Sequence, residues 1–507
     1  MRVNSLVKLI ALFAMFGLGL SRGQAQNLPN IVLMMGDDHG WEETGYNGHP
    51  HLKTPVLDEI ARTGLRFDRF HAAHPNCSPT RASFLTGRHP NRMGTFSPGY
   101  SFRPEEITIA HLLHQAGYRC GHFGKWHVGA VKKQSPVCPG AMGFDEWLSH
   151  DNFFELDPTL SRNGEAPEKF KGESSDILVT EAIEFIRKTQ QIARQKPDGL
   201  PFLSVIWFGS PHEPYSGLPE DLALYHDLPE LYADKQVKLT SNETGAQVSR
   251  KQGDVLRERY AEITAMDRAI GKMRSYLAES GLRENTILFY CGDNGTSADG
   301  LLKSPNRGQK GVVYEGGTLV PGLVEWPARI KQPMSTSITA CTSDLMPTFA
   351  SIVKQPLPNR PIDGINLLPA IEKGLTVREK PLCFWEFSSG RYNTERPLPY
   401  IDPVLQEGTT PLAKLMGGKA TRDFINFKHP SIEETDYRGA KAIIDGNFKL
   451  VVHDAGKQNK KELFDLSVDL GEQIDLSKQM PEQLDRLDNA LRSWQANVLN
   501  SLMGRDY

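Results

Sequence analysis

Four short apolar runs, each followed directly by polar residues, constrain the fold of this chain more than any other feature. They span residues 30–35, 118–123, 202–208 and 286–291. Helical patterns separate them at residues 108–116, 177–188 and 260–278. Runs of this length bounded by Gly, Pro and polar residues are typical of buried strands. Their alternation with helices predicts an α/β fold, a doubly wound, mainly parallel sheet flanked by helices.

The polar residues that follow these runs predict a binding or active site. Parallel strands end at one edge of a sheet, and ligands of doubly wound sheets bind outside the carboxyl ends of the strands. The four runs end in Gly36-Asp37-Asp38, Gly124-Lys125-Trp126-His127, Gly209-Ser210-Pro211-His212 and Gly292-Asp293-Asn294-Gly295. One such cluster alone would be an ordinary turn. Four of them at one edge indicate a site.

Residues 1–25 have the layout of a secretory signal peptide. Arg2 and Lys8 make a basic start, residues 9–20 are apolar, and residues 23–25 are small or polar. The apolar run is shorter than the roughly 20 residues that span a bilayer, so we expect no membrane anchor. The mature chain is expected to be exported to the periplasm or secreted. Six scattered Cys show no disulfide framework spacing.

The chain changes character after residue 375. Residues 386–437 carry many Pro, Gly, Ser and Thr and predict long loops. Residues 440–453 predict a hairpin around Asp445-Gly446, residues 462–466 a further strand, and residues 481–502 an amphipathic helix. We therefore expect a catalytic domain over residues 26–375. Residues 376–507 are expected to form a C-terminal α+β subdomain with a small antiparallel sheet and a terminal helix.

The overall charge gives no indication of a nucleic-acid partner. Lys and Arg number 58 and Asp and Glu 61, for a net charge of -3. Nucleic-acid-binding domains carry a basic patch and a basic balance. An anionic ligand of this chain must therefore be selected locally.

The most specific motif lies in residues 74–88, which read HPNCSPTRASFLTGR. Ser78 can cap a helix, Pro79 suits its first turn and Gly87 suits its end. Cys77 then sits at a helix N-terminus, where the helix dipole favours anions. Arg81, one turn further on, can face the same point. A buried structural Cys beside a paired Arg is the plainer interpretation, but Cys-x-Pro-x-Arg followed by Leu-Thr-Gly-Arg is far more specific.

With these motifs the chain resembles the formylglycine-dependent (type I, arylsulfatase-like) sulfatases of the alkaline-phosphatase-like superfamily. Lys310, Tyr314-Glu315-Gly316-Gly317 and Glu462-Leu463-Phe464-Asp465-Leu466 also match the family pattern in order and spacing. The resemblance implies a sulfuric ester hydrolase that releases inorganic sulfate. It further implies that a formylglycine-generating maturation enzyme oxidises Cys77, and that the formylglycine hydrate attacks the ester to give a covalent sulfo-enzyme.

The resemblance also implies a role for each site residue. One Ca²⁺ would be held by Asp37, Asp38, Cys77 as formylglycine, Asp293 and Asn294, and oxygen ligands suit such a hard cation. The expected catalytic residues are Cys77, Arg81, Lys125, His127, His212 and Lys310. Among these, Lys125, His212 and Lys310 bind the sulfate, and His212, with Lys310, protonates the leaving alcohol. His127 is the base that frees sulfate, and Arg81 orients the formylglycine. His39 is expected in a supporting role or as a substrate contact.

Two other functions stay open at this point. A phosphate or phosphonate monoesterase could use the same fold, and a non-catalytic glycan-binding protein would result if Cys77 were never oxidised. The expected substrate is a sulfated small molecule or oligosaccharide, as in polysaccharide degradation. Trp385, Phe387, Tyr392 and Tyr400 could stack on sugar rings, with Arg391 meeting a uronate or a second sulfate. Ordinary packing between the two domains explains these aromatic residues equally well.

Overall fold

A ten-stranded sheet forms the centre of the molecule. The computed structural model describes residues 28–196, 199–228, 235–241, 244–300, 304–388, 397–454 and 459–507, so the expected signal peptide lies outside it. The strand order in the sheet is β13-β2-β12-β11-β1-β8-β4-β5-β6-β7. The strands are β1 (Asn30–Gly36), β2 (Leu65–Phe67), β4 (Arg119–Lys125), β5 (Glu146–His150), β6 (Thr159–Arg162), β7 (Glu168–Lys169), β8 (Phe202–Trp207), β11 (Thr286–Gly292), β12 (Gly322–Glu325) and β13 (Met334–Thr336).

The four strands expected from the sequence lie next to one another in this sheet. β1 pairs in parallel with β11 on one side and with β8 on the other, and β8 pairs in parallel with β4. Their carboxyl ends therefore meet at one edge, although the chain visits them far apart in sequence. This arrangement confirms the doubly wound, mainly parallel α/β fold.

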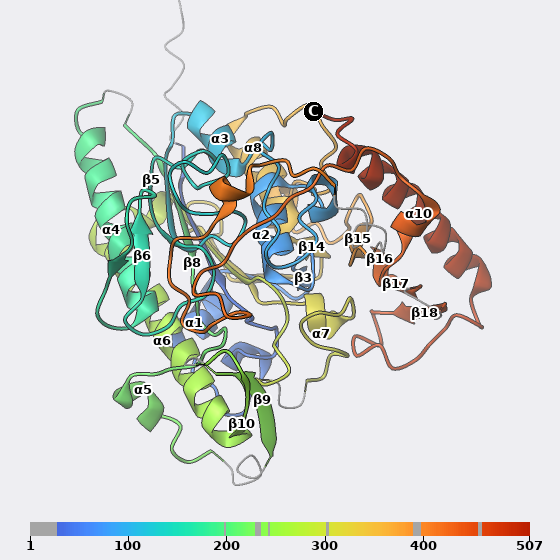
Figure 1. The fold of residues 1–507 in the computed structure, drawn as a ribbon, viewed down its shortest axis with the longest axis horizontal. Coiled ribbons are helices and arrows are strands. Elements are labelled where there is room, and N and C mark those ends of the chain that lie inside the picture. Colours follow the sequence, from blue (N-terminus) through green and yellow to red (C-terminus); the bar gives the residue numbers. More distant parts are fainter. Residues whose placement is uncertain are drawn as a thin grey trace, which may run out of the picture.

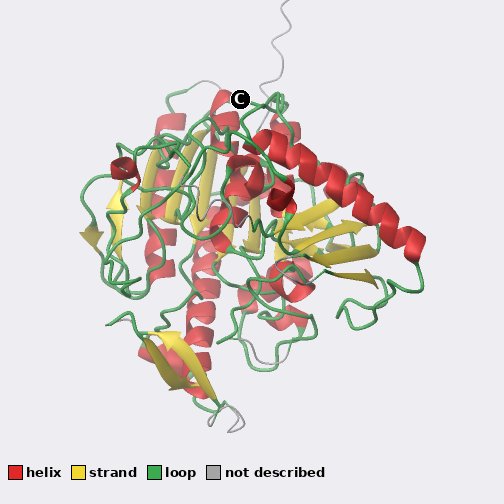
Figure 2. Ribbon diagram, turned by 45° about the vertical axis from the view of Figure 1, so that its right-hand side comes forward, coloured by secondary structure: helices red, strands yellow, loops and turns green. Residues whose placement is uncertain are grey.

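Helices cover both faces of the sheet (Figures 1 and 2). One face packs against α2 (Cys77–Thr86), α3 (Ile109–Gln115) and α8 (Leu345–Val353), and the other against α1 (Pro55–Thr63), α4 (Ser174–Ala193) and α6 (Gln252–Glu279). Successive residues of a strand point to opposite faces. Thus Leu33 of β1 joins the first core and Val32 the second, both fully buried. Burial on both faces explains why β1 is continuously apolar.

Smaller elements complete the larger domain. β3 (Phe70–His71) pairs with β14 (Ala340–Cys341), and β9 (Gln236–Thr240) with β10 (Gln247–Lys251). The short helices are α5 (Pro219–Ala223), α7 (Glu315–Thr318) and α9 (Leu368–Lys373). Single 3-10 turns lie at Gly45–Asn47, Pro90–Met93, Arg283–Asn285, Thr342–Asp344, Pro403–Gln406 and Glu434–Tyr437.

The C-terminal part forms a four-stranded antiparallel sheet covered by a long helix, as the sequence predicts. Its order is β15 (Leu382–Trp385), β16 (Lys441–Asp445), β17 (Phe448–His453), β18 (Lys460–Asp465), and the helix is α10 (Pro481–Leu502). In Figure 1 this helix runs along one side of the molecule beside the small sheet. The hairpin at Asp445-Gly446 is present, whereas β15 was not predicted.

Three of the aromatic residues that could stack on sugars, Trp385, Phe387 and Tyr400, make packing contacts within the protein. Trp385 lies in β15, is fully buried, and donates from Nε1 to the Arg438 carbonyl at 3.1 Å. Phe387 stacks on Phe96 at 4.3 Å between ring centres. The guanidinium of Arg103 lies 4.3 Å from the centre of the Tyr400 ring. The interpretation as a sugar platform is therefore wrong for Trp385, while Arg391 and Tyr392 lie outside the described residues.

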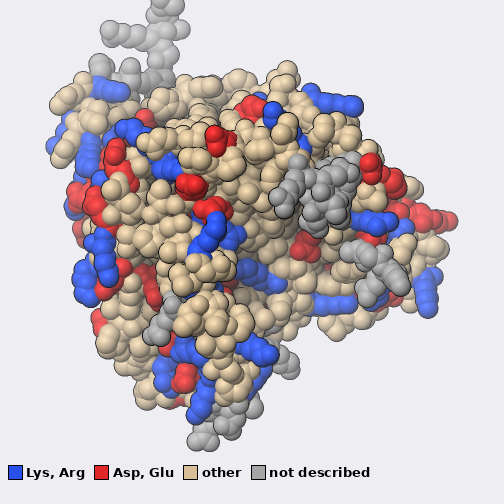
Figure 3. All heavy atoms as spheres, in the orientation of Figure 1, with Lys and Arg blue, Asp and Glu red and all other residues tan. Residues whose placement is uncertain are grey.

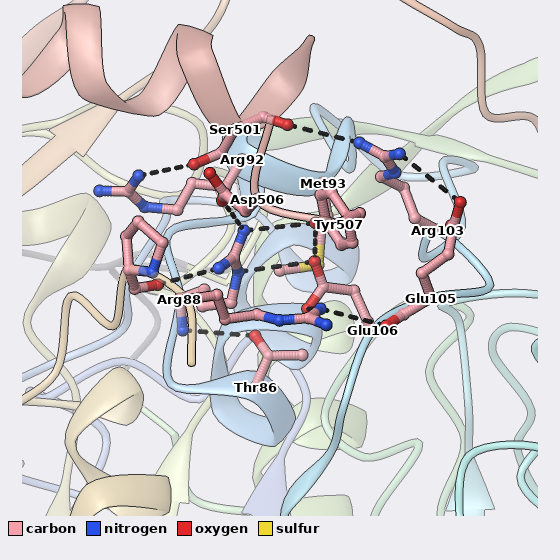
Figure 4. Close-up of polar contacts among 12 residues, drawn as sticks. Thr86, Arg88, Arg92, Met93, Arg103, Glu105, Glu106, Ser501, Asp506 and Tyr507 are labelled. Carbon is pink, nitrogen blue, oxygen red and sulfur yellow. Dashed lines mark hydrogen bonds and ion pairs between the residues drawn. The ribbon is translucent and has the colours of Figure 1, made fainter. Parts of the chain in front are cut away.

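A cluster of charged side chains ties the end of the chain to the helix that carries Cys77 (Figure 4). Arg88, which follows α2, donates from Nη2 to Asp506 at 2.7 Å. The Tyr507 hydroxyl donates to Glu106, and the Arg103 guanidinium lies 3.8 Å from the Tyr507 ring centre. The end of the chain after the terminal helix is thus fixed against the part of the fold that contains the ten-stranded sheet.

All six Cys are unpaired and buried, so the structure holds no disulfide between them. In the part of the chain that the structure describes, no helix is both long enough and apolar enough to cross a membrane.

Candidate active site

The polar residues that follow the four central strands meet at one edge of the sheet. Backbone hydrogen bonds continue beyond the strands and hold the loops together: Asp37 N donates to the Ser210 carbonyl at 2.9 Å, and Asp293 N to the Gly36 carbonyl at 3.0 Å. Asp38 adopts a left-handed conformation with φ 61° and donates from its backbone N–H to Asp293 Oδ1 at 2.9 Å. The predicted convergence of these side chains is therefore present.

Cys77 is the first residue of α2 and is buried at this edge. The helix ends at Gly87, as predicted. The φ of this residue is 69°, in the left-handed region that glycine adopts most readily. The expectation that Ser78 caps the helix is wrong, because Asn76 occupies the cap position. Ser78 Oγ instead donates to the His127 carbonyl at 2.6 Å. This bond fixes the start of α2 against the loop that follows β4.

Three carboxylates and three cationic side chains form an interlocked cluster beside Cys77. Arg81 donates from Nη2 and Nε to Asp293 Oδ2 at 2.7 and 3.1 Å. Lys125 Nζ donates to Asp37 Oδ2 at 2.5 Å, and Lys310 Nζ to Asp38 Oδ2 at 2.7 Å. Because each cation is already paired with an acid, the cluster carries no net positive charge of its own. An anion would be attracted here only with additional positive charge.

The oxygen atoms of the cluster fit a divalent cation. Asp37 Oδ1 and Asn294 Oδ1 are buried and have no hydrogen-bond partner among the residues that the structure describes. Ligand atoms of Asp37, Cys77 and Asp293 lie within 4.8 Å of one another, as do those of Asp37, Asp38 and His212. Burial raises the pKa of Asp37 although Lys125 opposes that effect. A bound cation would satisfy the free oxygens and stabilise the charge of Asp37.

Two histidines face the same space. Neither ring nitrogen of His127 has a hydrogen-bond partner among the described residues, and burial lowers its pKa well below the usual range, with Lys125 adding to the effect. His212 is hydrogen-bonded through Nδ1 to the Glu213 carbonyl at 2.5 Å, and its Nε2 lies 3.8 Å from Asp38 Oδ2. Burial lowers the pKa of His212 to about 3, against the opposing charge of Asp38. Both rings are neutral in the free protein.

His39 does not reach the cluster as a ligand. Its Nδ1 contacts the Tyr290 hydroxyl at 2.5 Å and its Nε2 the Glu43 carbonyl at 2.6 Å, so both ring nitrogens are occupied. His39 is fully buried, and these two hydrogen bonds are consistent with the expected supporting role.

A pocket of about 350 Å³ opens above Cys77. Its lining contains Cys77, His127, His212 and Lys310 from the predicted set. Sequence reasoning missed other lining residues: Asn152, Phe153, Glu213, Lys414 and Arg422. They come from loops without a motif. Only Glu213 could have been found from the sequence, since it directly follows the Pro211-His212 motif.

On the face shown in Figure 3, acidic and basic side chains are interspersed, so selection of an anion is local to the pocket.

Burial raises the pKa of the Cys77 thiol, although Lys125 and Lys310 oppose that effect. A thiol that stays protonated is a weak nucleophile. A doubly wound sheet with carboxylates, lysines and an arginine gathered beside Cys77 at its carboxyl edge is the arrangement expected of a hydrolase of the alkaline-phosphatase-like superfamily.

Comparison with known proteins defines the family. Residues 29–354 match the family described as Sulfatase. N-acetylgalactosamine-6-sulfatase of Mus musculus is 30% identical over 421 residues, covering 74% of this chain and 72% of the relative. Arylsulfatase A of Homo sapiens is 32% identical over 369 residues, 68% of each chain. The chain belongs to the sulfatase family and is a sulfuric ester hydrolase.

A solved structure agrees with the fold. A protein determined in complex with its substrate, D-glucosamine-2-N,6-O-disulfate, superposes with a TM-score of 0.69 at 20% identity, covering 93% of this chain and 98% of that protein.

Proposed function

We propose that this enzyme hydrolyses sulfate esters of carbohydrates at the pocket above Cys77, after conversion of Cys77 to formylglycine. The observation that carries the proposal is the position of Cys77. It is the first residue of α2, lines the pocket, and lies among the paired lysines and carboxylates of the strand ends. Its raised pKa leaves the thiol a poor nucleophile, so a chemically modified side chain suits this position better.

Asp37, Asp38, Asp293, Asn294 and the modified Cys77 are the residues that would hold the cation, which we propose is Ca²⁺. Carboxylate and amide oxygens without nitrogen or sulfur donors suit a hard cation. When bound, the cation supplies positive charge that balances the sulfate and polarises groups bonded to it. Asp37 Oδ1, which lies 3.6 Å from Arg81 Nη2, and Asn294 Oδ1 make no hydrogen bond among the described residues, and this supports the assignment.

Lys125 and Lys310 are proposed to hold the sulfate group and to offset the negative charge that develops during transfer. Lys310 lines the pocket, and although burial lowers its pKa, the charges of Asp38, Cys77 and Asp37 together raise it above its ordinary value. It therefore stays protonated at neutral pH. Arg81, held by Asp293 and by the Lys125 carbonyl, is proposed to orient the residue at position 77.

Formylglycine supplies, as its hydrate, one hydroxyl that attacks sulfur and a second whose deprotonation allows sulfate to leave. His127 is proposed as the acceptor of that second proton. Its ring is neutral and buried, and within the described part of the chain neither ring nitrogen is hydrogen-bonded, which leaves a nitrogen able to accept a proton. Ser78 fixes the backbone of His127 against α2, so the proposed base and residue 77 keep a fixed position relative to each other.

His212 is proposed to give a proton to the leaving alcohol, with Lys310 as the second donor. The bond from Nδ1 to the Glu213 carbonyl leaves Nε2 directed toward the acidic cluster. In the free protein this ring is neutral, since its pKa is about 3. Arrival of the anionic ester would favour its protonated form.

The carbohydrate substrate class follows from relatives. The name N-acetylgalactosamine-6-sulfatase and the complex with a disulfated glucosamine both describe enzymes that act on sulfated sugars.

We further propose that residues 1–25 direct export and that a formylglycine-generating enzyme matures Cys77. Residues 26–375 are proposed to form the catalytic part and residues 376–507 the C-terminal part. Sulfated polysaccharides occur outside cells, which agrees with export.

The test is mass spectrometry of the peptide that carries Cys77, from cells that contain the maturation enzyme, together with sulfate release from an aryl sulfate. We expect the mass of formylglycine and activity that is lost in Cys77→Ala and Cys77→Ser. A thiol throughout, or full activity in either variant, would refute the proposal. Turnover of an aryl phosphate or phosphonate in preference to the sulfate would favour the esterase alternative.

A further inference from the structure

One wall of the pocket is built by the C-terminal part of the chain. Lys414, Leu415, Met416, Gly417 and Arg422 line the same space as Cys77. None of them belongs to the cluster proposed to hold the sulfate. Two of them, Lys414 and Arg422, are cationic, and their surroundings differ.

Lys414 is already compensated. Its ammonium group donates to Glu213 Oε1 and lies 4.9 Å from the centre of the Phe153 ring. Phe153 in turn stacks on His212 at 5.2 Å between ring centres. The charge of Lys414 is thus balanced by Glu213 within the protein. Through Phe153, this side chain helps to position the ring of His212 at the pocket wall.

Arg422 has no acidic partner among the described residues. The hydrogen bond of its side chain is from Nη1 to Met416 Sδ, at 3.2 Å. The neighbouring Asp423 carboxylate is paired with Lys419. Burial lowers the pKa of Arg422, and the charges of Cys77 and Asp423 oppose this effect. A partly buried guanidinium without a carboxylate is costly, and a partner that arrives with the ligand would remove that cost.

The backbone makes room for this guanidinium. A Cβ atom on Gly99 would lie 2.5 Å from Arg422 Nη2, and Gly99 has a φ of 97°. A side chain at position 99 would displace Arg422 or strain the loop. The arginine therefore occupies a defined position at the pocket wall, with planar donors suited to a carboxylate or a sulfate.

We propose that Arg422 binds a second anionic group of the substrate, so that the preferred substrate is a sulfated sugar carrying another carboxylate or sulfate near the scissile ester. This inference rests on the proposed function, because it concerns the same pocket. It adds a specificity residue that no sequence motif marks.

The experiment compares aryl sulfates that carry a carboxylate at the ortho, meta or para position with their methyl esters. For at least one isomer we expect wild-type kcat/KM to be about tenfold higher for the carboxylate than for the ester. In Arg422→Gln this ratio should fall to about one, and Arg422→Lys should restore part of it. Lys428→Gln, which removes an exposed cation from the same loop region, should keep the wild-type ratio.

A second set of substrates distinguishes the two sources of the anion. Sulfated disaccharides with a uronate neighbour, with a second sulfate, or with neither are compared in wild type and Arg422→Gln. A ratio of one for every wild-type pair, or a preference that survives in Arg422→Gln, would overturn the inference. Absence of sulfate release from all substrates, the plain aryl sulfate included, would instead refute the proposed function.

Discussion

Arg259 and Asp38 are joined by a hydrogen bond of 2.6 Å from Nη2 of the arginine to the backbone carbonyl of the aspartate. The same guanidinium donates from Nη1 to the Pro211 carbonyl at 2.6 Å and forms a two-pronged ion pair with Glu43. One side chain of α6 therefore connects the loop that carries Asp37 and Asp38 to the loop that carries His212. Arg259 is a positioning residue for both.

Replacing Arg259 by Met should weaken the protein and its site together. Removal of one partner from a buried ion pair costs about 3–5 kcal/mol of unfolding free energy. Arg259→Lys keeps the charge but cannot reach both carbonyls and Glu43, so we expect folded protein with at least about tenfold lower cation affinity and kcat. Calorimetric titration with Ca²⁺ and steady-state kinetics measure the two effects. Lys272→Met, a change of a half-buried lysine on the same helix that contacts Asp176 and Thr180 and not the site, is the control. A variant Arg259→Lys with wild-type cation affinity would contradict the positioning role.

Removal of divalent cations should abolish sulfate release. The three carboxylates and three cationic side chains of the cluster balance one another, so without a metal ion the cluster beside Cys77 has no excess positive charge to offset the charge of the sulfate. Dialysis against a chelator, followed by assay with and without added Ca²⁺, is the measurement. Asn294→Ala removes one of the two unpartnered oxygens and should weaken cation binding about tenfold or more. Asn447→Ala, in an exposed turn, should not. Full activity after exhaustive chelation would count against the assignment.

The parts of this site that sequence could predict are those whose signal is local. β1 and β11 are runs of consecutive residues that are almost all buried, and the length and apolar character of both runs can be recognised in the sequence. Asp37 and Asp293 follow them directly, so strand prediction alone brings these acids to one edge. Cys77 and Arg81 are one helical turn apart, and their relation needs no tertiary information.

The parts that sequence could not predict depend on contacts between distant segments. Arg259 and Asp38 are 221 residues apart, and nothing around Arg259 on its long helix marks it. Arg422 lies in an irregular stretch whose path over the pocket no periodicity describes. The sequence predicts Ser78 as a helix cap, but its hydroxyl donates instead to the carbonyl of His127, 49 residues away. Tertiary partners outweigh local preferences at such positions.

Loss of the base should separate the two halves of the reaction. His127→Gln keeps the size of the side chain but cannot accept a proton at neutral pH. We expect a burst of about one equivalent of leaving alcohol per enzyme, followed by turnover reduced at least about 100-fold, as is usual for loss of general base catalysis. Rapid-mixing kinetics with a chromogenic aryl sulfate measure the burst. His212→Gln is the matched variant and should slow the burst itself. Equal effects of the two substitutions on the burst would contradict the assigned roles.

The pH dependence of the second step should follow the lowered pKa of His127. Burial, with Lys125, keeps the ring unprotonated well below its usual titration range. The base is therefore still active below the pH range in which an ordinary histidine is protonated, and its loss by protonation is expected only in more acidic solution. Single-turnover decay of the bound sulfate between pH 4 and 8 checks this. A rate that falls with a midpoint near 6.5 would contradict it.

Stability at low pH should depend on the buried pair of Glu315 and Lys449, which joins α7 to the C-terminal sheet. Lys449 Nζ lies 2.8 Å from Glu315 Oε1, and His71 Nε2 lies 3.0 Å from its other oxygen. Burial would raise the pKa of Glu315, but Lys449 and His71 hold it below its ordinary value of 4.5. An acid whose pKa is lowered by folding stabilises the protein above its unfolded pKa, and this contribution is lost as pH falls.

Glu315→Gln should therefore reduce the free energy of unfolding at pH 7 by about 3–5 kcal/mol, because Lys449 loses one of its buried partners. The difference from wild type should shrink from about pH 4.5 downward, because the Glu315 carboxyl of the unfolded wild type takes up a proton there while the folded protein holds it ionised. Urea unfolding between pH 3 and 7 measures this. Glu284→Gln, which removes an acid from an exposed pair with Lys331, should cost about 1 kcal/mol or less. A wild-type advantage over Glu315→Gln that stays constant down to pH 3 would show that the ion pair is not its source.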